Sequence, residues 1–311
     1  MRKARRAVRF RTGFLLLVAT GLIWGTIGVA GRLVFDRTEL DALEVSWLRT
    51  MFAAPVCLLF GLKMLGRDLF RVTPRALLAM AVLSATIYAF QFLYLIGVDE
   101  IGVSVATLVC LCSIPVMVAI ASAVLFGERP SRVVSLALIG AVGGTALLTI
   151  GQGGSAGKGG LAIGIGASLL SAVGATIYTL GSRAIVQRYH PITMLALGFP
   201  ITLVLFAPVM RGGHVSAGVP ASAWLLLIYL GVGTHGIAYL FYQWGLKTES
   251  ATVASIVTLL EPVLAAFLAW ILFDERLGLF GIMGALMLIA GLVLLTFSPQ
   301  PATISAESMA D

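Results

Sequence analysis

Glu261 is the residue whose type and position most strongly indicate chemistry. It lies near the middle of an apolar run over residues 250–273 and is followed directly by Pro262. A charged side chain at the centre of a bilayer costs about 2.5–3.5 kcal/mol, so the carboxyl must face a cavity or a partner, or carry a proton. We expect Glu261 to couple protons or to contact an amine of a bound molecule. The alternative is a structural carboxyl that satisfies backbone groups freed by the ring of Pro262.

Arg49 is the basic residue that lies well inside an apolar run, six positions after the start of residues 43–62. Its guanidinium has three possible roles. It can pair with Glu261, bind the carboxylate of a bound molecule, or reach back to the membrane surface by snorkelling.

Two apolar runs carry polar and aromatic residues at helical spacing. Residues 221–245 hold three of them on one face, at i, i+4 and i+7: His235, Tyr239 and Tyr242. Residues 74–97 hold a comparable set: Tyr88, Gln91 and Tyr94. A small-molecule site needs apolar walls with a few placed polar groups, so these faces predict the lining of a cavity.

Within these sets the prediction differs from residue to residue. Tyr88, Gln91, His235 and Tyr239 lie deep in their runs and are expected to contact substrate. Tyr94 and Tyr242 lie nearer the ends, where tyrosines also form interfacial belts.

Trp24 and Tyr178 are further candidates for contact with substrate, because each lies in the middle of its run, residues 14–34 and 159–181. For the aromatic residues the alternative is packing between helices. For His235 the alternative is a hydrogen bond between helices.

The composition places all of these residues in an integral membrane protein. Of 311 residues 59% are hydrophobic and 11% are charged, with a mean hydropathy of +1.02, whereas soluble domains have about 25% charged residues. Runs of roughly 20 apolar residues can cross a bilayer as helices. Ten runs meet or approach that length: 14–34, 43–62, 74–97, 101–126, 132–150, 159–181, 191–209, 221–245, 250–273 and 278–297.

The distribution of charge predicts the orientation. Six basic residues fall in the first eleven positions, and the net charge is +7. With the N-terminus inside, inner segments hold fifteen Lys and Arg and outer segments five, as the positive-inside rule requires. We therefore expect a multi-pass protein of the cell (inner or plasma) membrane with cytoplasmic tails at 1–13 and 298–311. The same pattern speaks against nucleic acid as a partner.

The two halves of the chain resemble each other. Residues 125–129 match residues 272–276 at an offset of 147, and Pro115 falls on Pro262 at the same offset. Closer to the N-terminal end of each half the matching residues are 148 positions apart, as Ala106 and Ala254 are. This change of offset implies one inserted residue within run 101–126 or 250–273. Because each half has five runs, an odd number, the second half must enter the membrane inverted. The predicted fold is all-α, with ten transmembrane helices as two inverted five-helix repeats over residues 14–150 and 159–297.

These motifs resemble a known family. Residues 260–263 (LEPV) and 272–276 (LFDER), followed by Gly284 and Gly291, are similar to the end of an EamA domain, the repeat unit of the drug/metabolite transporter superfamily. In the first half Ser113-Ile114-Pro115 replaces the carboxylate–proline pair, so that any role of that pair falls to Glu261 alone.

The resemblance implies a secondary-active transporter that exports small organic metabolites by alternating access. Amino acids or related compounds are the expected substrates, bound in a central cavity with protons as the candidate coupling ion. A multidrug exporter or a vitamin or cofactor permease is the alternative of the same fold.

An intramembrane enzyme or a lipid-handling protein is the alternative of another class, and it would need a second ionisable residue beside Glu261 or His235. We expect no enzyme activity, no catalytic residues and no cofactor. No metal site is expected, because Cys57, Cys110 and Cys112 fall inside apolar runs without metal-ligand spacing.

Overall fold

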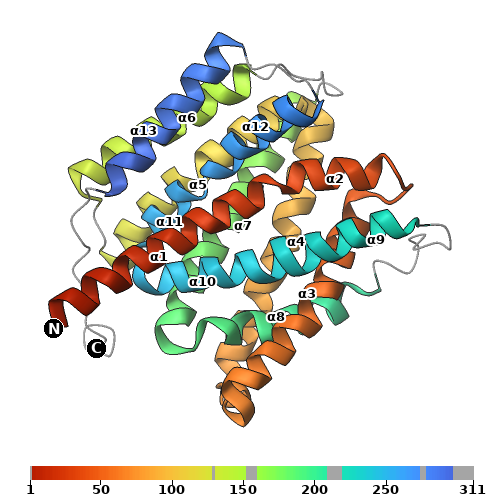
Figure 1. Ribbon diagram of the computed structural model, residues 1–311, viewed down its shortest axis with the longest axis vertical. Coiled ribbons are helices and arrows are strands. Elements are labelled where there is room, and N and C mark those ends of the chain that lie inside the picture. The colour runs from red at the N-terminus through yellow and green to blue at the C-terminus, as the bar shows by residue number, and fades with distance from the viewer. Residues whose placement is uncertain (1, 128–129, 152–159, 209–218, 274–277, 297–311) are drawn as a thin grey trace.

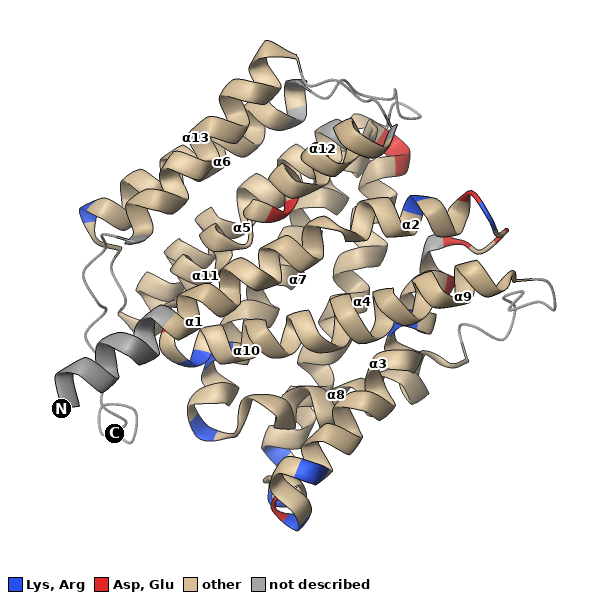
Figure 2. Ribbon diagram, viewed as in Figure 1, with Lys and Arg blue, Asp and Glu red and all other residues tan. Residues whose placement is uncertain are grey.

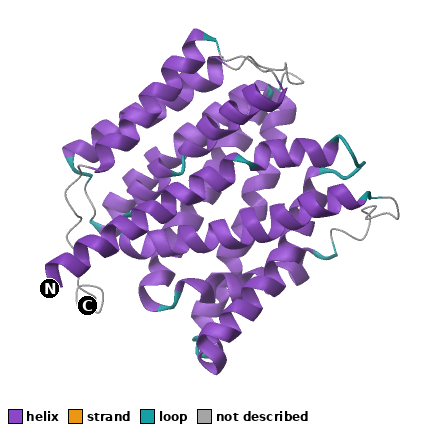
Figure 3. Ribbon diagram, in the orientation of Figure 1, coloured by secondary structure: helices purple, strands orange, loops and turns teal. Residues whose placement is uncertain are grey.

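The structure is a computed structural model that describes residues 2–127, 130–151, 160–208, 219–273 and 278–296 (Figure 1). Within these ranges it consists of helices and short loops, without strands (Figure 3). The first half contains α1 (Arg2–Gly25), α2 (Ile27–Phe35), α3 (Ala42–Leu65), η1 (Gly66–Phe70), α4 (Pro74–Ile101), α5 (Val103–Phe126) and α6 (Arg132–Gly151). The second half contains α7 (Leu161–Arg188), α8 (Pro191–Phe206), α9 (Ala221–Ile228), η3 (Tyr229–Ile237), α10 (Ala238–Thr248), α11 (Ala251–Val257), α12 (Leu260–Phe273) and α13 (Leu279–Thr296).

Seven helical segments are long and apolar enough to cross a membrane, which confirms a multi-pass protein. Three further apolar helices are shorter within the described residues: Arg132–Leu148, Pro191–Phe206 and Leu279–Leu295. The outward faces are apolar, as the bilayer requires: Val124 is 77% exposed and Val204 73%. Most charged residues lie towards helix ends (Figure 2). Ten spanning helices and the inverted relation of the halves stay predictions.

The helices pack with α3, α4, α7, α8 and α10 in one body, while α6 and α13 form a close pair at one side (Figure 1). Glycines allow the close approach of this pair: a Cβ on Gly144 would lie 2.7 Å from the carbonyl oxygen of Gly284. The described part of the expected tail at 1–13, from Arg2 onward, forms the beginning of α1. The expected tail at 298–311 lies outside the described residues.

Three of the predicted apolar runs are irregular helices in the structure. The run 14–34 is interrupted at Thr26, between α1 and α2. The run 221–245 contains the π-helix η3, and the run 250–273 is interrupted at Thr258 and Leu259. The last interruption lies shortly before Pro262. Pro262 has no N–H to give to the carbonyl of Thr258, and this carbonyl accepts the N–H of Glu261 instead, at 3.0 Å.

Candidate functional site

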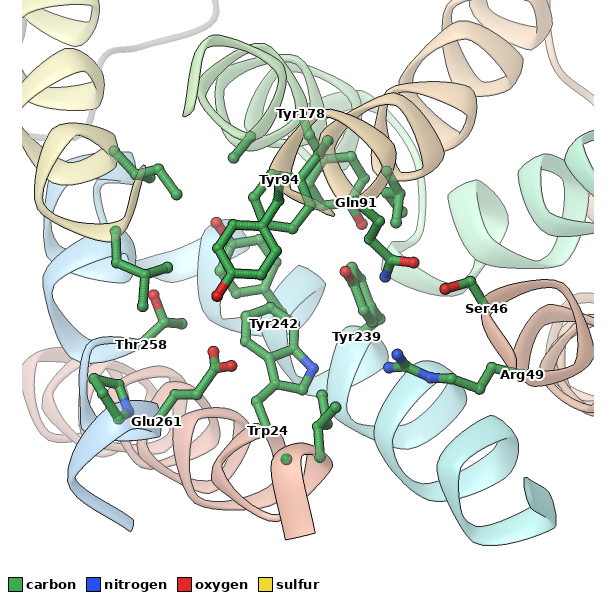
Figure 4. A pocket seen from close by; sticks show the side chains of 18 of the residues that line it. Trp24, Ser46, Arg49, Gln91, Tyr94, Tyr178, Tyr239, Tyr242, Thr258 and Glu261 are labelled. Carbon is green, nitrogen blue, oxygen red and sulfur yellow. The ribbon is translucent and has the colours of Figure 1, made fainter. Parts of the chain in front are cut away.

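A cavity of about 430 Å³ lies where these irregular helices meet. This volume is typical of small-molecule sites, which also have mostly apolar walls with a few polar groups. The wall combines aliphatic and aromatic side chains with a small polar set from α3, α4, α7, α11, α12 and the break before α12 (Figure 4): Ser46, Arg49, Thr86, Gln91, Thr179, Ser255, Thr258 and Glu261.

Arg49 and Glu261 approach the cavity from opposite sides, with Trp24 and Tyr239 between them (Figure 4). No ion pair joins the two charges among the described residues. Each of them is therefore able to meet an opposite charge on a bound molecule.

Arg49 is held in place by its own helix and by the π-helix. The start of α3 is fixed by a capping box, in which Asp41 and Glu44 bond each other's backbone N–H groups. Two turns later Arg49 is buried, at 7% exposure, and its Nη2 donates a hydrogen bond of 3.1 Å to Oγ1 of Thr234. The guanidinium thus lies buried at the cavity wall, a position that favours contact with a bound molecule over snorkelling.

Glu261 stands in the first turn of α12, directly after the interruption of the helix. The N-terminal end of a helix carries a partial positive charge that favours an anionic side chain. Helix α1 packs against this turn because Gly25 has no side chain: a Cβ there would lie 2.8 Å from the Glu261 carbonyl oxygen. The Glu261 side chain lines the cavity, and the carbonyl left open by Pro262 is satisfied by a backbone N–H.

An aromatic cluster forms the wall between the two charges. Trp24 of α1 lies 4.9 Å from Tyr239 and 5.5 Å from Tyr242, ring centre to ring centre. Tyr178 of α7 contacts the same two tyrosines, at 5.8 and 6.3 Å. The hydroxyl of Tyr242 is paired with Thr179 at 2.8 Å. Three helices therefore present a rigid surface of rings to a bound molecule.

Six of the eight residues predicted for the site line the cavity: Trp24, Arg49, Gln91, Tyr178, Tyr239 and Glu261. Their contact with substrate stays a prediction.

Tyr88 and His235 lie behind the wall instead. The hydroxyl of Tyr88 donates to Oγ1 of Thr50, which also lies 3.3 Å from Nε2 of His235. His235 stacks on Phe199 at 4.7 Å. This position favours the hydrogen bond between helices that was the alternative for His235.

Several lining residues lie outside the eight residues predicted for the site. For Tyr94 and Tyr242 the alternative was a position in an interfacial belt, but both side chains line the cavity. Their repeat-related positions were the signal that could have identified them. Ser46, Thr258 and the supporting Thr234 carry no such signal, because isolated hydroxyl residues are common in membrane helices.

Within the described part of the chain, no three His, Cys, Asp or Glu side chains come together as a metal site would require. Another carboxyl, that of Glu249, follows α10 between two spans and is buried, at 1% exposure. Burial raises the pKa of Glu249 to about 8, and the nearby Arg183 partly opposes this shift.

The sequence profile of the EamA-like transporter family matches residues 11–150 and 162–297. An uncharacterized transporter of Clostridium kluyveri is 24% identical over 298 residues, covering 91% of this chain and 93% of that protein. An uncharacterized transporter of Archaeoglobus fulgidus is 29% identical, with 91% and 96% covered. The uncharacterized inner membrane transporter YicL of Salmonella typhimurium is 23% identical, with 93% and 97% covered. A solved crystal structure has the same fold, with a TM-score of 0.78, 19% identity and coverage of 97% of this chain and 99% of that one.

Proposed function

This chain belongs to the EamA-like transporter family, and from this premise we propose that it exports small zwitterionic metabolites. Amino acids and related compounds are the substrates in this proposal. Transport is secondary-active and proceeds by alternating access across the inner membrane.

The observation that carries the proposal is the placement of Arg49 and Glu261 on opposite sides of one cavity (Figure 4). A guanidinium binds a carboxylate through charge-assisted hydrogen bonds, and a carboxylate accepts hydrogen bonds from an ammonium group. A zwitterion satisfies both groups at once. The aromatic cluster between them offers an apolar surface for the remainder of the molecule.

A multidrug exporter or a vitamin or cofactor permease is the competing proposal. The rings of Trp24, Tyr178, Tyr239 and Tyr242 would suit flat apolar compounds. The two charges in the lining favour a zwitterion over such compounds, because an apolar ligand would leave both of them desolvated and unpaired.

Alternating access is supported by the direction in which the cavity extends. Its lining follows α2 from Ile27 to Phe35, towards the end of the span that the positive-inside rule places outside. At the other end of the same span Leu17 is fully buried against α10. We propose an outward-facing state, with both termini and the flanking tails in the cytoplasm.

Glu261 is the proposed proton-coupling residue. A carboxyl that is hydrated in one state and enclosed in the other changes its affinity for a proton between the two. Export of a zwitterion can then be driven by proton entry.

The test uses purified protein in liposomes with a panel of amino acids and two analogues of each. Amidation removes the carboxylate and N-acetylation removes the ammonium group. We expect wild type to bind the zwitterion and to bind both analogues more weakly. Arg49→Gln should abolish the discrimination against the amide, and Glu261→Gln the discrimination against the acetylated compound. Equal binding of the zwitterion and both analogues by wild type would contradict the proposal.

A further inference from the structure

Thr234 lies at the centre of the π-helix η3 and is fully buried, and it joins two residues of the cavity wall from different helices. Its side chain contacts Arg49 of α3, and its backbone carbonyl contacts Trp24 of α1. It does not itself line the cavity.

The backbone carbonyl of Thr234 belongs to the π-helical winding and accepts a hydrogen bond from another helix. At the end of η3 the N–H of Ala238 bonds to the carbonyl of Gly233. In an α-helix the same N–H would bond to the carbonyl of Thr234. Nε1 of Trp24 donates to this carbonyl, at 3.1 Å. A backbone carbonyl of η3 is therefore the acceptor that holds the indole ring.

The hydroxyl of Thr234 is fixed in direction. It donates its proton to the carbonyl oxygen of Leu230 at 2.6 Å, and a hydroxyl has a single proton to give. Its lone pairs are thereby left to accept the Nη2 of Arg49 at 3.1 Å. Nε of Arg49 has no hydrogen-bond partner. Thr234 is thus the hydrogen-bond partner of the guanidinium within the described residues.

Close backbone approach makes this contact possible. A Cβ on Gly231 would lie 2.8 Å from the carbonyl oxygen of Arg49, so that η3 and α3 touch at the level of the arginine itself. A guanidinium has five N–H donors in a fixed plane. One bond to Thr234 orients that plane and leaves donors for a bound carboxylate.

We propose that Thr234 is a positioning residue, whose hydroxyl orients Arg49 to receive the carboxylate of the substrate and so determines the preference for carboxylates. The inference rests on the proposed zwitterion site. Its test therefore includes one measurement that needs no substrate.

The variants separate the hydroxyl from the shape of the side chain. Thr234→Val keeps the shape and the backbone carbonyl but removes the hydroxyl, whereas Thr234→Ser keeps the hydroxyl. Thr234→Ala replaces Thr234→Val if the latter folds poorly. Thr202→Val is the matched control, because Thr202 is also buried and bonds to a carbonyl one turn before it, at 2.9 Å, away from the cavity.

The first measurement is the rate at which phenylglyoxal modifies Arg49, followed by mass spectrometry of the peptide that contains it. A guanidinium released from Thr234 becomes more accessible to the reagent. We expect several-fold faster modification in Thr234→Val than in wild type, Thr234→Ser or Thr202→Val. Modification of Thr234→Val at the wild-type rate overturns the proposal, whether or not the protein transports zwitterions.

The second measurement compares L-leucine with L-leucinamide in liposomes. We expect Thr234→Val to raise the KM for L-leucine about tenfold, as the loss of a hydrogen bond to a charged group predicts, with little change in maximal rate. The weaker binding of the amide should stay unchanged, and Thr234→Ser should restore the wild-type KM. An equal loss for both compounds would show a general structural role and overturn the proposal. If neither compound binds to wild type, the proposed function fails at this substrate, and the phenylglyoxal rates still decide the role of Thr234.

Discussion

Two helical segments at aligned positions of the chain, α5 and the pair α11–α12, share a proline but differ in structure. Pro115 lies inside α5, which continues unbroken from Val103 to Phe126. Pro262 lies in the first turn of α12, and the chain before it leaves the helix at Thr258 and Leu259. Both prolines line the same cavity.

The spacing of the residues explains the difference. Nine positions separate Ala106 from Pro115, but eight separate Ala254 from Pro262. The shortening coincides with the interruption between α11 and α12. Proline by itself is therefore not enough to break the helix here, and the break lies in the half with the shorter spacing.

The chemistry differs along with the backbone. The neighbour of Pro115 is Ile114, whereas the neighbour of Pro262 is Glu261, and both neighbours line the cavity. An interrupted helix offers a helix N-terminus beside the carboxyl, which the continuous α5 lacks. The comparison teaches that the acidic side of the cavity depends on the break as much as on the carboxyl.

Removal of the Glu261 charge leaves both segments without a charged residue beside the proline. This change should have the largest effect on transport. Glu261→Gln keeps shape and hydrogen bonding but cannot carry a proton. Groups that transfer protons contribute about 10²–10⁴-fold to the steps they serve, and we expect proton-driven export to fall at least roughly 100-fold. Exchange of substrate down its own gradient should persist.

Proton flux and counterflow in liposomes measure both quantities for this variant. Glu39→Gln, in an exposed loop, is the control that should leave both unchanged. Unaltered proton flux in Glu261→Gln would leave the carboxyl without a coupling role.

Transfer of the carboxyl to α5 tests whether the break matters. The double variant Ile114→Glu/Glu261→Gln has the same composition of charge, but its carboxyl stands in a continuous helix. We expect no recovery of transport and a loss of stability of about 2.5–3.5 kcal/mol, the cost of a charge within the membrane. Thermal unfolding in detergent and proton flux in liposomes test this pair of expectations. Recovery of coupling would show that the interruption is dispensable.

Substitution of each proline should separate structure from transport. Pro115→Ala replaces a proline inside a continuous helix and should raise stability by up to about 3 kcal/mol, with transport largely retained. Pro262→Ala gives the carbonyl of Thr258 an N–H at α-helical spacing, so that the helix can close across the break. Transport should then fall while stability changes little. If Pro115→Ala and Pro262→Ala changed transport equally, the proposed difference between the two prolines would be contradicted.

The smallest effect is expected at Glu249, a buried carboxyl that lies outside the cavity. Its pKa of about 8 in the folded protein lies above the ordinary value, so the folded state binds more protons than the unfolded state between these values. Stability must then fall as pH rises towards 8. Glu249→Gln should flatten this dependence and leave substrate preference unchanged. Thermal unfolding between pH 5 and pH 8.5 is the measurement, and an equally steep fall in the variant would contradict the assignment.

Much of the site could be predicted because its residues are unusual for their surroundings. Arg49, Gln91 and Glu261 are polar groups in long apolar runs, and their desolvation cost implies a cavity or a partner. Trp24, Tyr178 and Tyr239 were found from depth and helical spacing. The same reasoning could not place Tyr88 and His235, which share these features but lie behind the wall.

The sequence by itself determined the membrane class, the approximate limits of the helices and the family, because each depends on local hydropathy, charge and motif. The tertiary structure decided which face of each helix meets the cavity. Lipid and protein interior are both apolar, so a helix that is hydrophobic all round gives no periodicity that distinguishes them. It also decided the contacts of the irregular segments: the hydroxyl of Thr26 bonds to Tyr229, and the backbone carbonyl of Thr234 accepts Nε1 of Trp24, a partner far away in the sequence. Hydrogen bonds of this kind, such as that from Trp24 to Thr234, exist only once the helices have packed together.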